Sequence, residues 1–193
     1  MKYIRCLMCL VMLLGAVSTG YAAMIINIYE QGDDVIISGS GTIDVSSLTY
    51  QGTSNPVAFM VPIQGALAVP GPSGSNLTYT GISGPDSFGA IGGLFYPDIS
   101  TSNYGFVFQG WQKQMSIDFT YAGEVINFSQ TYLNQSFASL GFTSDTLTWN
   151  WDSDYIEVTV EEAQAPVPEP ATMLLLGGGL AGLAGIRRRA NKA

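Results

Sequence analysis

Hydrophobic and polar residues alternate along the middle of the chain in short runs, and the alternation has the period of a β-strand. Ile156, Val158 and Val160 are separated by Glu157 and Thr159. This spacing places the hydrophobic side chains on one face of a strand and the polar side chains on the other. Runs of this kind, rich in β-branched and aromatic residues, predict strands. They lie at residues 25–29, 35–38, 77–82, 104–109, 116–121, 124–128, 147–151 and 155–160.

Turn-forming residues separate these runs. Gly, Pro, Asp and Ser cluster at residues 32–34, 38–41 and 70–74. Ala122-Gly123 is short enough to predict a hairpin between residues 115–121 and 124–128, and Phe119 is expected on the buried face of its first strand. Residues 83–103, rich in Gly, Ser, Pro and Asp, predict a long loop across one end of the fold.

The strand and turn signals together predict an all-β domain, an antiparallel β-sandwich of about eight to ten strands. The pattern does not distinguish a jelly-roll from an immunoglobulin-like arrangement. The expected domain, called the body below, covers residues 23–163, and residues 164–167 are expected to be a linker. A helix is predicted only at each end of the chain, one in a signal and one in a short hydrophobic tail.

The N-terminal residues 1–22 have the features of a secretory signal peptide. Lys2 and Arg5 precede an apolar run at residues 7–17, which is short for a membrane span and typical of a signal. Small side chains at Gly20 and Ala22 fit the A-x-A pattern before a cut. We therefore expect signal peptidase to cleave between Ala22 and Ala23.

The C-terminal segment, residues 168–190, has three parts in order. Pro168, Glu169 and Pro170 form an extended handle, because the two prolines cannot continue a helix. Sixteen residues of an apolar run follow, from Ala171 to Ile186, and would span about 24 Å as a helix, which is marginal for permanent anchorage. The final part is the basic cluster Arg187, Arg188 and Arg189, which the positive-inside rule keeps in the cytoplasm as a stop-transfer signal.

This order of motifs resembles the PEP-CTERM protein-sorting domain of Gram-negative bacteria. The resemblance implies recognition and processing by a membrane protease of the exosortase class, with a transient inner-membrane stage and then the outer surface or the extracellular matrix. It also implies association with exopolysaccharide or biofilm. Residues 30–44 resemble an opening found in several proteins with this tail, which implies a shared first hairpin and no catalytic residue. An ordinary single-pass anchor is the alternative.

Charge and composition exclude several kinds of function. The chain has 7 basic and 15 acidic residues, and Lys113 is the only basic residue within the body. Nucleic acid is therefore not an expected partner. Histidine is absent, and Cys6 and Cys9 both lie in the expected signal peptide, so neither a Ser-His-Asp relay nor a thiolate metal site can be built in the body.

Carboxylates and aromatic rings remain as candidate chemistry. Calcium is a weak expectation at Asp33 with Asp34, or at Asp152 and Asp154 with Asp145. Trp149 and Trp151 share one strand face, either in the core or as a platform for sugar rings, and core packing is favoured. These residues yield three hypotheses. The first is a non-enzymatic surface or matrix protein without catalytic residues or cofactor, the second is a carbohydrate- or calcium-binding module, and the most remote is a hydrolase that relies on carboxylates.

Overall fold

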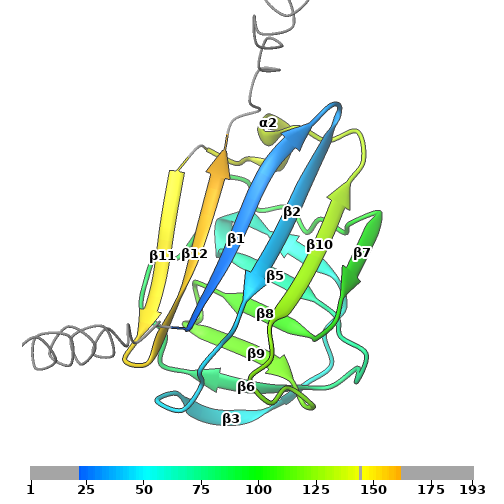
Figure 1. The fold of residues 1–193 in the computed structure, drawn as a ribbon. Helices are drawn as coiled ribbons and strands as arrows, with labels where there is room; N and C mark the ends of the chain where they lie inside the picture. The colour runs from blue at the N-terminus through cyan, green and yellow to red at the C-terminus, as the bar shows by residue number, and fades with distance from the viewer. Residues whose placement is uncertain (1–21, 144, 162–193) are drawn as a thin grey trace, which may run out of the picture. The chain divides into compact units, whose positions relative to one another are not determined.

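The computed structural model describes residues 22–143 and 145–161, which form two six-stranded sheets packed face to face. Sheet A has the order β11-β12-β1-β2-β10-β7, and sheet B has the order β3-β6-β9-β8-β5-β4. Figure 1 shows the strands of sheet A running crosswise in front of those of sheet B. The predicted all-β sandwich is confirmed, and its sheets pack in the orthogonal manner instead of the aligned one.

The strands of sheet A are long and mostly antiparallel. Their bounds are β11 Asp145–Trp151, β12 Asp154–Glu161, β1 Ala22–Gln31, β2 Asp34–Gly41, β10 Ile126–Tyr132 and β7 Ile99–Ser102. One neighbouring pair differs: β1 runs parallel to β12, with Ala22 opposite Asp154 and Tyr29 opposite Glu161. The first and last strands of the body therefore lie side by side in the middle of this sheet.

Sheet B has shorter strands, and all its pairs are antiparallel. Their bounds are β3 Thr49–Ser54, β6 Asn76–Thr80, β9 Gln114–Asp118, β8 Phe106–Gln109, β5 Ala66–Val69 and β4 Phe59–Val61. A 3-10 turn, η1 at Pro62–Gln64, precedes β5, and a one-turn helix, α2 at Phe137–Leu140, follows β10. Ser136 and Ser139 form a capping box at its start, which satisfies backbone donors that a helix end otherwise leaves free.

The core lies between the sheets and follows the predicted alternation. Ile156, Val158 and Val160 are buried, while Glu157 and Thr159 between them are half-buried on the outer face. The same alternation runs through β1, β2 and β10. Burial of these apolar side chains supplies the main favourable contribution to folding.

Several predicted turns and strands are corrected by the structure. Residues 38–41 are the second half of β2 and not a turn. The predicted hairpin at Ala122-Gly123 is wrong, because β9 belongs to sheet B and β10 to sheet A, so this connection crosses between the sheets. Phe119 follows the end of β9 and is 64% exposed, so its expected place in the core is also wrong. The long loop at 83–103 contains β7 near its end.

Candidate functional site

A continuous row of uncharged polar side chains crosses the outer face of sheet A. The strand register places one residue from each of the six strands in this row, because Asn27 lies opposite both Thr159 and Ser38. Thr159 in turn lies opposite Thr146, while Ser38 lies opposite Ser129 and Ser129 opposite Thr101. We call these residues the outer polar row: Thr146, Thr159, Asn27, Ser38, Ser129 and Thr101.

Every member of the outer polar row is exposed or half-buried, and each side chain carries a hydroxyl or an amide. The chain neighbours of the four central members, such as Val158 and Val160 beside Thr159, are buried on the inner face. The row therefore presents hydrogen-bond donors and acceptors to solvent without any ionisable group.

The neighbouring row on the same face has a mixed character. Ile25 lies opposite Glu157 and Ser40, and Ser40 lies opposite Asn127. The hydroxyl of Ser40 donates to Oδ1 of Asn127 at 2.9 Å, which fixes both side chains across β2 and β10. Glu157 is the only carboxylate among these four residues.

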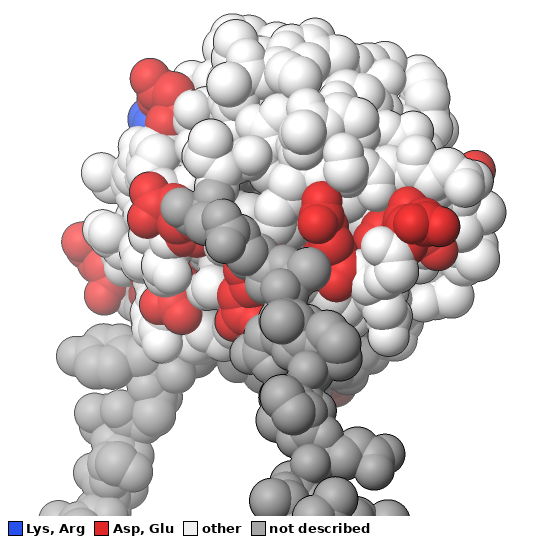
Figure 2. Space-filling view, turned by 90° about the horizontal axis from the view of Figure 1, so that it is seen from above, with Lys and Arg blue, Asp and Glu red and all other residues white. Residues whose placement is uncertain are grey.

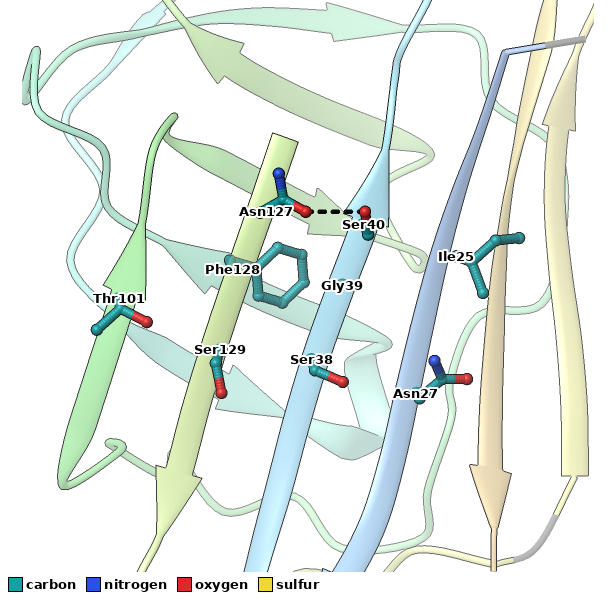
Figure 3. Close-up of a pocket in the computed structure, with 9 residues that line it drawn as sticks. All are labelled: Ile25, Asn27, Ser38, Gly39, Ser40, Thr101, Asn127, Phe128 and Ser129. Atoms are coloured by element: carbon teal, nitrogen blue, oxygen red, sulfur yellow. Dashed lines mark hydrogen bonds between the residues drawn. The ribbon is translucent and has the colours of Figure 1, made fainter. Parts of the chain in front are cut away.

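An open hollow of about 450 Å³ lies over both rows (Figure 3). It extends across β1, β2, β10 and β7. Its lining consists of Asn27, Ser38, Ser129 and Thr101 from the outer polar row, Ile25, Ser40 and Asn127 from the adjacent row, and Gly39 with Phe128 beneath them. The hollow is shallow and mostly neutral, which suits a broad contact with a hydroxylated polymer better than the enclosure of a small substrate.

Charge is sparse on the rest of the surface as well. Figure 2 shows acidic side chains distributed around one end of the molecule, with wide uncharged areas between them. Lys113 is bonded to Asp86 at 2.6 Å and to the carbonyl oxygen of Gly84 at 2.6 Å. The net negative charge of the body therefore repels anions. Its single basic side chain, Lys113, is held by Asp86 and Gly84.

Trp149 and Trp151 are core residues, which agrees with the favoured prediction, and the alternative of a stacking platform is contradicted. Trp149 is 0% exposed and Trp151 is 8% exposed. Trp149 donates from Nε1 to the carbonyl oxygen of Pro85 at 2.6 Å, and Trp151 donates from Nε1 to that of Asp44 at 2.7 Å. The ring of Trp149 also packs edge-on against Phe108, with centroids 4.6 Å apart.

The accessible indole belongs to Trp111, which counts among the aromatic residues that suggest carbohydrate binding but is not one of the two candidate site residues. Trp111 is 49% exposed and lies between β8 and β9, where its backbone N–H donates to the carbonyl oxygen of Gln64. No alternation marks this position, because the residue lies in a turn outside any strand. Gly110, next to it in the sequence, would have been the one available signal of a turn.

The weak calcium candidates are not gathered into one cluster. Asp145 begins β11, while Asp152 and Asp154 lie at the opposite end of the β11–β12 hairpin, so the expected grouping of these three is wrong. Oδ1 of Asp34 accepts the N–H of Asn134 at 2.9 Å, and Asp33 is exposed beside it. Among residues 22–143 and 145–161, no group of three or more acidic, His or Cys side chains could hold a metal ion.

Within residues 22–143 and 145–161, two carboxylates are buried, and each accepts backbone hydrogen bonds. Asp118, 1% exposed in sheet B, accepts from the N–H groups of Gly105 and Thr120 and from the Thr120 hydroxyl. Burial raises the pKa of Asp118, but these hydrogen bonds outweigh it and hold the pKa below its ordinary value. Burial raises the pKa of Asp154 in sheet A. Its backbone hydrogen bonds do not offset this effect, so the pKa of Asp154 lies above its ordinary value. The two carboxylates therefore lie in different sheets, and their pKa values are shifted in opposite directions.

The expected signal peptide, apart from Ala22, and the C-terminal segment 168–190 lie outside the described residues, including Pro168, Glu169, Pro170 and the arginine cluster. In the part of the chain that the structure describes, no helix is long and apolar enough to cross a bilayer. The structure thus carries no information on the expected membrane segment from Ala171 to Ile186. Of the expected signal cleavage site, Ala22 and Ala23 are described, as the first two residues of β1.

Comparison with known protein families identifies the tail. Residues 166–189 match the PEP-CTERM protein-sorting motif, which confirms the resemblance seen in the sequence. The match does not extend into the sandwich. No curated protein and no solved structure matches the chain. The motif is that of an exported protein, sorted by exosortase and held transiently at the membrane through its C-terminus.

Proposed function

We propose that the body is a non-enzymatic component of the cell surface or extracellular matrix, without catalytic residues or cofactor, and that sheet A contacts neutral polysaccharide through its outer face. The observation that carries this proposal is the outer polar row, six hydroxyl and amide side chains in register across the whole sheet. Such groups can each donate and accept hydrogen bonds, as sugar hydroxyls do.

Charge favours a neutral polymer over an anionic one. The body holds fourteen of the 15 acidic residues and only one basic residue, so an anionic chain would be repelled. The row itself adds no charge that would bind a cationic polymer. Contacts to single sugar units would be weak, and affinity would come from many simultaneous contacts along an extended chain.

Affinity electrophoresis tests the proposal. The mature chain, residues 23–193 in a nonionic detergent, is run in native gels that contain dextran, hydroxyethyl cellulose or alginate. We expect the neutral polymers to retard the protein and alginate to leave its mobility unchanged. Ser129→Arg, in the middle of the row, should remove the retardation because its long charged side chain lies across the hollow.

Thr53→Arg is the matched control, since Thr53 is exposed on β3 of the other sheet. This variant has the same change of charge and should be retarded like the original protein. Circular dichroism checks that each variant keeps its β structure. Unchanged mobility in all three polymers, with the fold intact, would reject polysaccharide contact through this face.

A further inference from the structure

Asp154 is a buried carboxylate at the point where the first strand of the body begins. Its residue is 3% exposed. Oδ2 accepts the N–H of Asp44 at 2.7 Å, and Oδ1 accepts the N–H of Tyr155 at 2.7 Å. Both oxygens thus have a backbone donor, and neither has a cationic partner among the described residues.

The hydrogen bond from Asp44 to Asp154 passes the start of β1. In sheet A, β1 lies between β12 and β2. Asp154 begins β12, whereas Asp44 lies just beyond the end of β2, so the two come from opposite sides of β1 (Figure 1). Ala22 is the partner of Asp154 in the parallel ladder. Because neighbouring strands lie about 4.8 Å apart, the peptide group between Ala22 and Ala23 lies next to the backbone of Asp154.

The backbone at Ala23 is held in place from both sides. Ala23 pairs with Tyr155 on β12, and Met24 pairs with Gly41 on β2. A Cβ added at Gly41 would lie 1.9 Å from the carbonyl oxygen of Ala23, so β2 approaches this residue closely. A charged group formed at the nitrogen of Ala23 would therefore remain beside Asp154.

No basic side chain of the described residues can neutralise Asp154. Lys113 is the only Lys or Arg among them, and it is bonded to Asp86. The titratable groups that face this end are acidic or phenolic: Asp44 after β2, Tyr121 on the β9–β10 connection and Asp152 in the β11–β12 turn. Burial and the charge of Asp44 both raise the pKa of Asp154.

We propose that Asp154 is the binding site for the α-ammonium group that signal cleavage creates at Ala23, so that removal of the signal peptide itself stabilises the sandwich. The proposal rests on the expected cut between Ala22 and Ala23. Before the cut, the nitrogen of Ala23 belongs to a neutral amide, and no counter-ion from residues 22–143 or 145–161 lies beside the buried Asp154. After the cut, a positive charge lies beside it, and a buried charge that has a partner avoids the large penalty of a buried charge left alone.

The stability that the ammonium group at Ala23 contributes depends on pH. The ammonium group, with an ordinary pKa of about 7.7–8.0, gains a partner in the fold, so its folded pKa is raised. Its contribution is fully present below the unfolded pKa and is lost as pH rises through the folded pKa. Without the ammonium group, the raised pKa of Asp154 instead makes the fold less stable as pH rises through that pKa. The two forms should differ most near pH 6.5 and should converge near pH 10.5.

Thermal unfolding of four chains tests the proposal. Residues 23–193 are prepared in detergent with a free or an acetylated α-amino group at Ala23, each with Asp154 and with Asp154→Asn. At pH 6.5 we expect acetylation to lower the Tm of the Asp154 chain by at least about 3 °C. A modest loss of folding stability shifts the Tm of a domain of this size by about that amount. Acetylation should change the Tm of the Asp154→Asn chain by less than about 1 °C, because no carboxylate remains to pair with the ammonium group.

Asp152→Asn is the matched control, since Asp152 is exposed in the turn just before β12 and its loss should leave the effect of acetylation unchanged. If Asp154→Asn does not fold, the Asp154 chains alone decide the matter, because their difference must disappear at pH 10.5. Equal Tm values for the free and acetylated chains at pH 6.5 would overturn the proposal. So would a difference that persists in the Asp154→Asn background or at pH 10.5.

Discussion

The ring of Phe128 occupies the space that a side chain on Gly39 would need. The two residues lie opposite each other on β10 and β2, and a Cβ added at Gly39 would come 2.2 Å from Cε1 of Phe128. Phe128 also stacks on Phe106 of the other sheet, with ring centroids 6.0 Å apart. Gly39 therefore lets one aromatic ring join the core while the outer face above it stays open as the hollow.

Gly39→Ala should destabilise the fold by about 1–3 kcal/mol, because the new methyl group overpacks the site and displaces Phe128. Urea unfolding measures the change as a lower midpoint. Phe128→Leu in the same chain should reduce the penalty, since the two positions are in contact and their effects are not additive. Gly92→Ala serves as the control, because a Cβ there meets only the Cγ2 methyl group of Ile63, at 3.4 Å. A Gly39→Ala chain as stable as the original would contradict this packing.

The three tryptophans should divide into one accessible and two protected indoles. Trp111 is 49% exposed, against 0% for Trp149 and 8% for Trp151. Acrylamide should therefore quench only part of the fluorescence, and Trp111→Phe should remove that part and shift the remaining emission to the blue. Trp149→Phe is the comparison, since it should leave the quenchable part in place. Full quenching of the Trp111→Phe chain would show that the buried pair is open to solvent.

Asp118 should make the fold sensitive to acid. Its folded pKa is lower than its unfolded pKa of about 3.9, so its contribution to stability is present above that value and is lost as pH falls through the folded pKa. Asp118→Asn should lower stability at pH 7 by about 1–3 kcal/mol, because it leaves the donors of Gly105 and Thr120 poorly paired. The variant should also lose less stability than the original between pH 5 and pH 3, roughly the range in which a carboxylate titrates.

Asp86→Asn is the control for this pH series. Asp86 pairs with Lys113 on the surface, and such pairs contribute about 0–1 kcal/mol. Urea titrations at each pH measure both variants. An Asp118→Asn chain with the same acid sensitivity as the original would contradict the assignment.

The strands that the sequence predicts best are those with one buried face. β12 alternates strictly between buried and half-buried positions, so its period alone identifies it. β5 was missed because all four of its residues are buried, so it has no alternation. β7 was missed for the opposite reason, since its residues are mostly small and polar and lie at a sheet edge.

The candidate site could not have been predicted from one sequence. The outer polar row exists only in the register of six strands, and one of its links, Asn27 with Thr159, joins the two ends of the body. Local turn chemistry does not reveal which sheet the next strand joins, as Ala122-Gly123 illustrates. Spacing did place Trp149 and Trp151 on one face, but which face is buried depends on how β11 packs against Phe108 and its neighbours.

The sorting tail leads to a prediction that is independent of the sandwich. If exosortase recognises the Pro-Glu-Pro handle, Pro168→Ala with Pro170→Ala should block C-terminal processing, because alanines would allow a helix in the segment that its two prolines are expected to keep extended. Gel mobility and mass spectrometry of the protein from cells that contain the protease would show the unprocessed chain in the membrane fraction. Pro72→Ala, in an exposed turn of the body, should be processed normally. Normal maturation of the double variant would instead indicate an ordinary single-pass anchor.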